Sequence, residues 1–556
     1  MTSRVRHCAR LVIVFLGICC ITSGVYLFRN WIEMFTRMRG KEMALSPTSR
    51  SFEGWKVSPL PLNFDVYLFN WTNPEDFYVG SGKKPRFEQL GPYRFRESPD
   101  KVDIDWHNHN YSVSFHKKSW FYFDAEASNG SLSDVVNTVN SVAHSAALRA
   151  AGTWGGSVVN FFSNVYSQKA FVTKTAEELL FKGYQHPFVT LGKFFRPEDV
   201  PYHRIGFQYP RNGSAGFDGD INMFTGVDDI AKMGQIHTWN NLTHTAFEGS
   251  CGDVHGSMGE FFPPNLGTND TVYMYMPKMC RAIPLDYTET VTVHGVTAYK
   301  YSGTEHAVDN GTLYPETSCY CVNGKCSPIG VINIGPCAFN SSVYMSFPHF
   351  YKGDPSYLEA IEGLQPEREK HEFFMTLEPN AGVPMDVGGG FQANYFMEPV
   401  PGNTIFENVP TVMMPMMWCE ERVRVSEEIA NDIALVPLIV LLGQIVTGIL
   451  LAGGLICTCW YPTRQVTHFC QSDPKAKASV LRPLTTFGVG SPASTAPPLS
   501  QLFRTNQSET GNERVGVRLL DYRRDSGVRE EMGTVEGSPR ERLIGMESSD
   551  GIAITR

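Results

Sequence analysis

The chain has 556 residues, with 48 lysines and arginines against 57 aspartates and glutamates, and its formal net charge is −9. A weakly acidic chain without a block of basic residues argues against a nucleic-acid partner. Hydrophobic residues make up 42% of the sequence. Long uncharged runs near both ends direct attention to a membrane instead.

The first uncharged run, residues 11–28, reads LVIVFLGICCITSGVYLF. A helix that crosses the bilayer core needs about 20 apolar residues, so this run and its flanks predict a transmembrane helix. A cleaved signal peptide is the alternative, but the run exceeds the usual apolar core of a signal and no small-residue cleavage site follows it. Arg4, Arg6 and Arg10 precede the run, so the positive-inside rule places residues 1–10 in the cytosol.

Residues 29–432 are predicted to form an ectodomain rich in antiparallel strands. Apolar and polar residues alternate in 111–115, in 271–276 and in 290–301, where His294-Gly295 interrupts the pattern. Such alternation between Gly, Pro and Asn positions is typical of antiparallel β structure.

The same segment contains sequons for N-linked glycosylation, which suit a surface outside the cytosol. The predicted glycosylation sites are Asn70, Asn110, Asn129, Asn212, Asn241, Asn269, Asn310 and Asn340.

Residues 131–195 interrupt the strand pattern and predict a cluster of helices. Apolar residues in 132–146 follow helical spacing. Thr175 and Glu178 have the spacing of a capping box, which predicts a helix that begins there. The apolar stripe either packs against the strands or forms an exposed docking face for a ligand.

The second uncharged run, residues 433–461, predicts another transmembrane helix, within which Pro437 and Gln444 are tolerable. Two spans return the C-terminus to the cytosol. Residues 462–556 form a predicted cytosolic tail, and from about Gln471 its Ser, Thr, Pro, Gly, Arg and Glu content is typical of disorder.

The 13 cysteines divide by compartment. Disulfides are the expected state outside the cytosol. Cysteines beside a span are candidates for palmitoylation, with an inert thiol as the alternative; the candidates are Cys8, Cys457, Cys459 and Cys470.

The crowded stretch Ser318–Cys326, SCYCVNGKC, is predicted to be a hairpin around an Asn323-Gly324 type I′ turn. Cys321 and Cys326 would then form a non-hydrogen-bonded pair with Cα atoms about 4.5 Å apart, within disulfide range. Cys319 lies roughly 6.6 Å back along the strand, so a bond to Cys321 is disfavoured. A zinc site needs four ligands, and this stretch supplies three cysteines.

No catalytic residue, metal site or cofactor is predicted. His107-Asn-His109 resembles a metal pair, but strands hold such pairs without metal. HGSMGE at 255–260 departs from the G-x-S-x-G nucleophile motif. Phosphate-loop and dinucleotide fingerprints are absent from the sequence, which argues against an enzyme.

Several short stretches together resemble the class B scavenger receptor family, which includes fatty-acid translocase, the lysosomal integral membrane protein type two and the sensory neuron membrane proteins. The resemblance covers about residues 5–465. Its motifs occur in family order: TNPEDF (72–77), LGPYRF (90–95), ELLFKGYQHP (178–187), FFPP (261–264), CRAIPL (280–285), FPHF (347–350) and LEPNAGVP (377–384).

The resemblance implies an irregular antiparallel β-barrel ectodomain with an apical helical bundle and an internal apolar tunnel, held by two transmembrane helices. It also implies a receptor for lipids, lipoprotein particles or other anionic ligands. Such a receptor passes fatty acid, sterol or carotenoid through the tunnel to the membrane without a chemical step. A homo-oligomer is possible within this expectation.

For six cysteines, sequence alone leaves fifteen pairings, and the resemblance implies Cys251–Cys319, Cys280–Cys337 and Cys321–Cys326. Some members of the family instead join the two cysteines of the C-x-C. Cys419 is a seventh cysteine, expected as a free thiol or an intermolecular link.

Some members of the family use a lysine pair at the apex to attract anionic ligands. The corresponding candidates are Lys169 and Lys174, with Phe171 between them. Ordinary solvated lysines are the alternative.

The expected location is the plasma membrane, with both termini in the cytosol. An alternative is a receptor of the lysosomal or endosomal membrane that carries a lumenal enzyme; Leu543-Ile544 resembles a sorting signal, but Pro539 stands where an acidic residue is expected. A two-span ligand-gated channel is a remote alternative, since the second run offers only Gln444 and Thr447 to a polar pore.

Overall fold

Two long helices contain the predicted spans. The computed structural model describes residues 3–49, 51–58, 62–78, 81–195, 200 and 202–472. Helices α1 (Ser3–Met43) and α8 (Glu427–Ser472) extend past both ends of the predicted runs. Their apolar windows, Leu11–Met34 and Glu427–Cys459, are long enough to cross a membrane.

The predicted tail is described only at its beginning. Residues 462–472 continue helix α8, and the start of the cytosolic tail stays a prediction. Residues from 473 onward, including Leu543-Ile544, lie outside the described residues.

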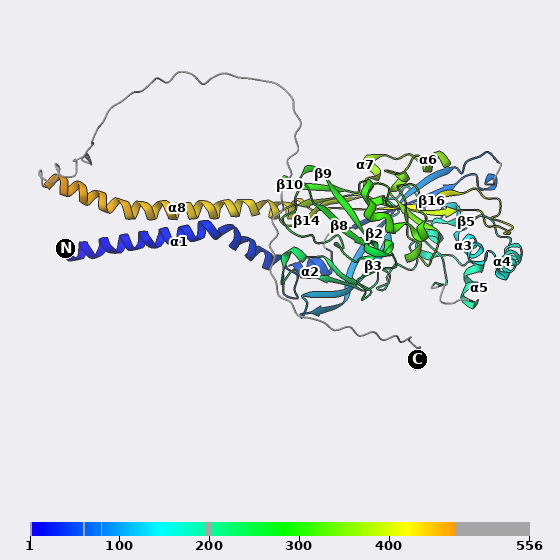
Figure 1. Ribbon diagram of the computed structural model, residues 1–556, viewed down its shortest axis with the longest axis horizontal. Coiled ribbons are helices and arrows are strands. Elements are labelled where there is room, and N and C mark those ends of the chain that lie inside the picture. Colours follow the sequence, from blue (N-terminus) through cyan, green and yellow to red (C-terminus); the bar gives the residue numbers. More distant parts are fainter. Residues whose placement is uncertain are drawn as a thin grey trace, which may run out of the picture. The chain divides into compact units, whose positions relative to one another are not determined.

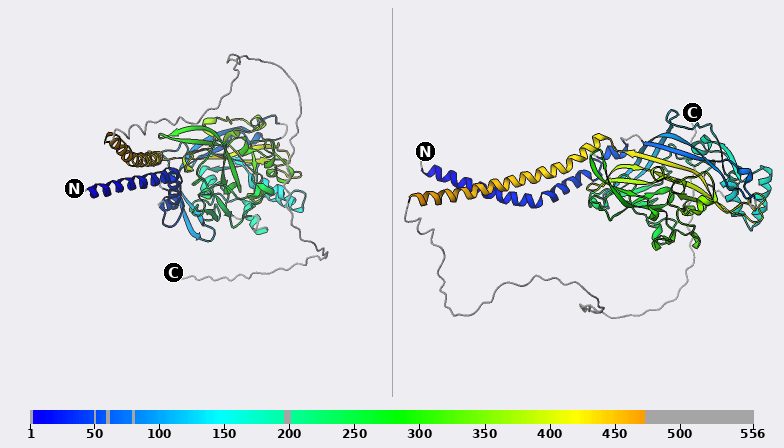
Figure 2. Two further views of the ribbon diagram at one scale, coloured as in Figure 1. Left: turned by 60° about the vertical axis from the view of Figure 1, so that its left-hand side comes forward. Right: turned by 90° about the horizontal axis from the view of Figure 1, so that it is seen from above.

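The α1 and α8 helices lie side by side (Figures 1 and 2). The indole Nε1 of Trp31 donates a hydrogen bond of 3.1 Å to the carbonyl oxygen of Val440. The Trp31 ring packs where Gly443 has no side chain, since a Cβ at that position would lie 1.9 Å from Trp31 Cε2. Small residues allow this close approach of helices in a bilayer.

The body of the protein is a 14-stranded antiparallel sheet that curves into an almost closed barrel. Along the sheet the order is β7-β6-β3-β2-β1-β16-β14-β13-β10-β9-β8, and β15, β12 and β11 branch from β16. Gly256 and Ser257 bridge its two edges: Ile236 N donates to Gly256 O at 2.8 Å, and Tyr275 N donates to Ser257 O at 2.7 Å. These bonds satisfy the edges of an otherwise open sheet.

The strands of this sheet are β1 (Leu62–Trp71), β2 (Phe87–His107), β3 (Ser112–Phe123), β6 (Ile221–Phe224), β7 (Ile236–Trp239), β8 (Thr271–Met276), β9 (Arg281–Val293), β10 (Val296–Ser302), β11 (Ile332–Asn333), β12 (Val343–Ser346), β13 (Phe374–Glu378), β14 (Val383–Gly388), β15 (Gly390–Met397) and β16 (Val412–Arg424). The remaining strands, β4 (Val135–Val139) and β5 (Phe171–Thr175), form a separate two-stranded sheet. Shorter helices are α2 (Ser51–Lys56), α3 (Ser141–Ala150), α4 (Trp154–Val165), α5 (Pro187–Phe195), α6 (Ser356–Ala360) and α7 (Arg368–His371).

The strand predictions from alternation are confirmed. Residues 271–276 form β8, and 290–301 divide between β9 and β10. His294 and Gly295 connect these two strands with φ of 47° and 82°, the left-handed conformations that a type I′ hairpin requires.

Helices α3, α4 and α5 gather at one end of the β body, called the apical end below, and α8 leaves from the other (Figure 1). The predicted helical cluster is wrong for 135–139, which forms strand β4 and pairs with β5. Val136 and Val139 are nevertheless buried. As β-branched residues they also suit a strand. The Thr175 capping box is present: Glu178 N donates to Thr175 Oγ1, and Thr175 N donates to Glu178 Oε2.

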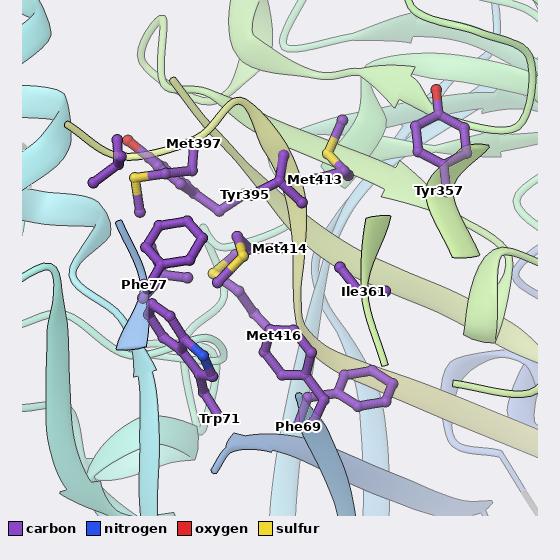
Figure 3. Close-up of a cluster of buried hydrophobic side chains, with 14 of the residues drawn as sticks. Phe69, Trp71, Phe77, Tyr357, Ile361, Tyr395, Met397, Met413, Met414 and Met416 are labelled. Carbon is purple, nitrogen blue, oxygen red and sulfur yellow. The ribbon is translucent and has the colours of Figure 1, made fainter. Parts of the chain in front are cut away.

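A methionine-rich cluster supports the apical helices (Figure 3). Met397 of β15 and Met413, Met414 and Met416 of β16 belong to this cluster together with Trp71 of β1. Buried alanines of α3 pack against this cluster. Flexible thioether side chains fill irregular gaps well, so the core fits the helices to the sheet.

The stretch 318–326 is not the predicted hairpin. It consists of two 3₁₀ turns, Pro315–Tyr320 and Val322–Gly324. The N–H of Lys325 donates to the carbonyl of Val322 at 3.1 Å. A 3₁₀ turn brings residues three apart together, and it holds Cys321 and Cys326 close without a strand ladder.

Candidate functional site

An open groove at the apical end contains all three predicted ligand contacts. Lys169, Phe171 and Lys174 line a space of about 340 Å³. Strand β5 presents Phe171 and Lys174, and the segment before α5 forms the facing wall with Tyr184 and His186. We call this space the apical groove.

The two lysines of the apical groove have different surroundings. Lys169 Nζ lies 2.7 Å from Glu75 Oε1, in a pair exposed on both sides, and 5.2 Å from the centre of the Phe171 ring. Lys174 Nζ lies 5.0 Å from the Tyr184 ring and 4.0 Å from Glu178 Oε1. Both ammonium groups therefore remain near solvent, where an incoming anion can compete for them.

His186 also lines the apical groove, and its role was not predicted. Its Nδ1 accepts a hydrogen bond of 3.2 Å from the Phe188 N–H, which caps the first turn of α5. The buried Nε2 has no hydrogen-bond partner among the described residues. Burial, with Lys174 as a smaller cause, lowers the pKa of His186 to about 4, so the ring is neutral and Nε2 carries the proton. The sequence did not predict this role, because a single histidine before a proline is not a recognised capping or binding motif.

Beside the groove, helices α4 and α5 expose large apolar side chains. Trp154 and Phe194 are 80% and 81% exposed. The others in this set are Phe161, Val165, Tyr166 and Phe195. Of the two readings of the stripe at 132–146, packing against the strands describes most of it: Ala143 is buried in the core, although Val135 is 62% exposed. The exposed apolar face belongs to helices later in the chain. Clustered exposed aromatics mark interaction surfaces.

The ectodomain cysteines are bonded in the pattern that the resemblance implies. The structure joins Cys251 to Cys319, Cys280 to Cys337, and Cys321 to Cys326. The Cα atoms of the last pair are 4.7 Å apart. The cysteines of the C-x-C therefore reach separate partners, and the bonds tie the 249–252 and 315–320 turns together. Cys419 forms no disulfide, and burial raises the pKa of its thiol to about 12.

The predicted glycosylation sites differ in accessibility. The exposed asparagines are Asn129, Asn212, Asn241, Asn269 and Asn340, and Asn70 and Asn110 are half-buried. Asn310 is buried, and its Nδ2 donates to the Ser327 carbonyl. A glycan on that nitrogen does not fit this conformation, so the prediction for Asn310 is at odds with the structure.

The candidate palmitoylation sites and the histidine pair lie in different parts of the chain. Cys457 and Cys459 are exposed on α8, and the side chains of Cys8 and Cys470 lie outside the described residues. His107 Nε2 lies 2.9 Å from Ser114 Oγ. No group of three or more His, Cys, Asp or Glu side chains that could hold a metal occurs within the described part of the chain.

A second charged site lies on the face of the sheet that carries Phe64 and Phe121. Glu421 of β16 pairs in register with Phe64, and Glu97 of β2 with Phe121. Lys117 shares the Phe121 face of β3, because side chains alternate along a strand. Arg211, Asp218 and Lys278 reach the same place from outside the sheet, and we call these six residues, Glu97, Lys117, Arg211, Asp218, Lys278 and Glu421, the buried charge cluster.

The ion pairs of the buried charge cluster are loose. Arg211 Nη2 lies 3.5 Å from Glu97 Oε1 and 3.6 Å from Glu421 Oε1. Lys117 Nζ lies 3.9 Å from Glu97 Oε1, and Lys278 Nζ lies 3.5 Å from Asp218 Oδ1. Both Glu97 oxygens and Arg211 Nε are buried without a hydrogen-bond partner among the described residues.

Three groups at this site combine burial with access. Burial, then repulsion from Glu97, raises the pKa of Glu421, although 46% of its side chain is accessible. Burial lowers the pKa of Lys278 to about 7, although its side chain is 39% accessible. Cys419 is likewise half-buried with a raised pKa.

Comparison with known proteins agrees with this architecture. The model of the CD36 family matches residues 15–465. Protein peste of Drosophila melanogaster is 81% identical over 99% of both chains. Scavenger receptor class B member 1 of Bos taurus is 28% identical over 73% of this chain and 79% of its own length, and human lysosome membrane protein 2 is 29% identical over 70% and 80%. The chain therefore belongs to the CD36 family.

Proposed function

We propose that the protein is a plasma-membrane receptor that docks lipid or lipoprotein particles at its apical end and passes single lipids toward the bilayer. The observation that carries the docking step is the exposed apolar face of α4 and α5 beside the cationic apical groove. Both termini would then lie in the cytosol, with α1 and α8 as the spans.

The exposed aromatics supply the affinity for a lipid surface. Burying one such side chain contributes about 1.5–3 kcal/mol, and Trp154 and Phe194 are almost fully available for burial. A lysine near an anionic lipid surface adds about 1 kcal/mol, and Lys169 and Lys174 lie in the adjoining groove. The two effects together fit a particle whose surface is both apolar and anionic.

The passage of lipid needs a path that excludes water, since each exposed CH₂ costs about 0.8 kcal/mol. Membership of a family that includes scavenger receptor class B member 1 favours such a path. No chemical step is required, so the proposal does not include an enzyme.

Uptake by cells that express the full chain tests the proposal. Labelled sterol ester, carotenoid and fatty acid are supplied on particles, with surface staining as the measure of expression. The Trp154→Ser/Phe194→Ser variant should reduce uptake of all three at unchanged surface level. Tyr122→Ser removes another exposed aromatic, 58% accessible, from β3 and should leave uptake unchanged.

Strong surface staining without uptake of any lipid would contradict the conduit. Staining confined to lysosomes would favour the second candidate, a receptor of that membrane. One relative carries the name lysosome membrane protein 2, which is the observation that keeps this candidate.

A further inference from the structure

A groove of about 440 Å³ lies at the end of the β body from which α8 leaves. Strands β9, β10, β13, β14 and β16 line it together with α7. Arg422 of β16 faces this groove, whereas the neighbouring Glu421 belongs to the buried charge cluster. Side chains alternate along a strand, so the groove and the cluster lie on opposite faces of the sheet. We call this space the basal groove.

The basal groove lies next to the proposed span. Val293, which lines the groove, packs in one apolar cluster with Val425 and with Ala430 of α8. The first residues of α8, from Glu427 to Asp432, rise about 8 Å along the helix and are rich in carboxylates. This rise is close to the thickness of a head-group layer, about 5–8 Å on each side of the bilayer. The basal groove therefore opens at the level of lipid head groups.

Four charged side chains of the groove neutralise one another. Lys300 Nζ lies 2.7 Å from Glu372 Oε2, and Arg368 Nε lies 3.3 Å from Glu372 Oε1. Glu289 Oε1 lies 3.4 Å from the same lysine and 3.6 Å from the same arginine. These four residues form a closed network with equal numbers of cations and anions.

Two other charged side chains of the groove have no such partner. Arg422 and Glu369 are exposed, line the groove and form no ion pair among the described residues. Arg424 pairs with Asp386, but 56% of the Arg424 side chain stays accessible. Residues two apart on a strand lie about 7 Å apart on one face, so the two guanidinium groups can hold one phosphate between them.

The order of these charges along the groove matches a phospholipid head group. Strand β16 leads into α8, and Arg424 pairs in register with Asp386 near that end. The pairing of Phe374 with Gly388 lies at the opposite end of β13 and β14. Helix α7, which carries Glu369, precedes β13 and lies farther from α8 (Figure 1). The arginines are therefore nearer to the membrane than the glutamate, as the phosphate of a lipid is nearer than its terminal ammonium.

We propose that the basal groove binds the head group of a zwitterionic phospholipid in the adjacent leaflet. Arg422 and Arg424 hold the phosphate, and Glu369 holds the ammonium. The inference rests on α8 as a membrane span, as in the proposed function, but the lipid is a resident neighbour of the protein and not cargo in transit. It would tie the β body to the bilayer surface beside the span. An anionic phospholipid without an ammonium would meet the Glu369 carboxylate and bind less well.

Retention of phosphatidylcholine and phosphatidylglycerol with matched acyl chains by the purified full chain tests this inference. Both lipids are supplied in equal amounts in detergent, and native mass spectrometry counts the molecules of each that stay bound. The wild type should retain more phosphatidylcholine than phosphatidylglycerol. Arg422→Gln should lower the retention of phosphatidylcholine about fivefold, which is the size of one charge contact at a lipid surface.

Glu369→Gln is the second variant. It removes the carboxylate that attracts the ammonium and repels an anionic head group, so the preference for phosphatidylcholine should disappear. Arg86→Gln is the matched control. Arg86 is also an exposed arginine, 2.8 Å from Glu362, but it precedes Phe87 of the methionine-rich cluster near the apical end, so this variant should retain both lipids as the wild type does. Thermal unfolding of each variant shows whether it is folded.

Equal retention of the two lipids by the wild type would overturn the inference, as would wild-type retention by folded Arg422→Gln or an unchanged preference in folded Glu369→Gln. Displacement of phosphatidylcholine by an equal concentration of glycerophosphocholine would assign the groove to a soluble phosphodiester and overturn it too. Absence of lipid uptake in the cell assay would contradict the proposed function alone, because a lipid in the basal groove does not enter the conduit.

Discussion

The apical groove and the buried charge cluster both contain lysines that face carboxylates, but the two sites differ in how far these pairs are exposed to water. Lys169 of the groove is 59% exposed and pairs with an exposed glutamate. Lys117 of the cluster shares Glu97 with Arg211, and the Glu97 side chain is only 1% exposed. Exposed pairs contribute about 0–1 kcal/mol, because water and salt screen them, whereas an unpaired buried charge is strongly destabilising.

This difference in exposure means that the groove lysines are free to bind a ligand, whereas the cluster residues contribute to the stability of the fold. A groove lysine can release its carboxylate for an incoming anion at little cost. Loss of Glu97 removes the carboxylate nearest to Lys117 and leaves Arg211 only its contact with Glu421, which is costly for charges in a buried setting. Breaking each site in turn should therefore give effects of very different size.

The largest expected effect is that of Glu97→Gln. The substitution leaves Arg211 and Lys117 without the carboxylate that both face. The free energy of unfolding of the full chain in detergent should fall by about 3–5 kcal/mol, measured by denaturant titration.

Glu75→Gln is the control for that titration. It removes the exposed partner of Lys169 and should change the stability by less than about 0.5 kcal/mol. Equal effects of the two substitutions would contradict the contrast between the sites.

His186 tests an intermediate case, since it lines the apical groove but is buried. Its pKa in the folded protein is about 4, below the value of about 6.5 for an unfolded histidine. The unfolded state therefore binds more protons between these values, and the stability falls as the pH drops through this range. Between pH 7 and pH 5, His186 should account for a loss of about 2 kcal/mol.

His186→Asn isolates this contribution. An asparagine oxygen can accept the Phe188 N–H in place of Nδ1 and cap α5, but it does not titrate. The variant should lose about 2 kcal/mol less than the wild type on the same acidification. Parallel curves for the two proteins would show that His186 does not remain neutral in the fold.

Local patterns predicted much of this molecule because their causes are local. Alternation placed β8, β9 and β10, and His294-Gly295 marked the turn between two of them. The capping residues Thr175 and Glu178 meet as their spacing predicts. Each of these depends on neighbours within a few positions.

Features that depend on distant partners were missed or misread. Residues 135–139 have helical spacing, but pairing with β5 makes them a strand, so tertiary context overrode the local pattern. Asn323-Gly324 lies in a 3₁₀ turn although it carries a strong hairpin signal. The buried charge cluster brings Glu97, Arg211 and Glu421 together from distant parts of the chain, so no spacing pattern in the sequence predicts it.

The smallest expected effect on stability is that of Lys169→Gln/Lys174→Gln. Both lysines take part in accessible or long pairs, so the free energy of unfolding should change by less than about 1 kcal/mol. Binding to vesicles that contain anionic phospholipid should nevertheless fall about tenfold or more at low salt, because each lysine contributes about 1 kcal/mol at a charged surface. The difference should vanish at 1 M salt, where the screening length is about 3 Å. Lys352→Gln, which disrupts another surface pair, with Glu305, should leave vesicle binding unchanged, and a similar loss in that control would mean that net charge rather than the apical groove attracts the anion.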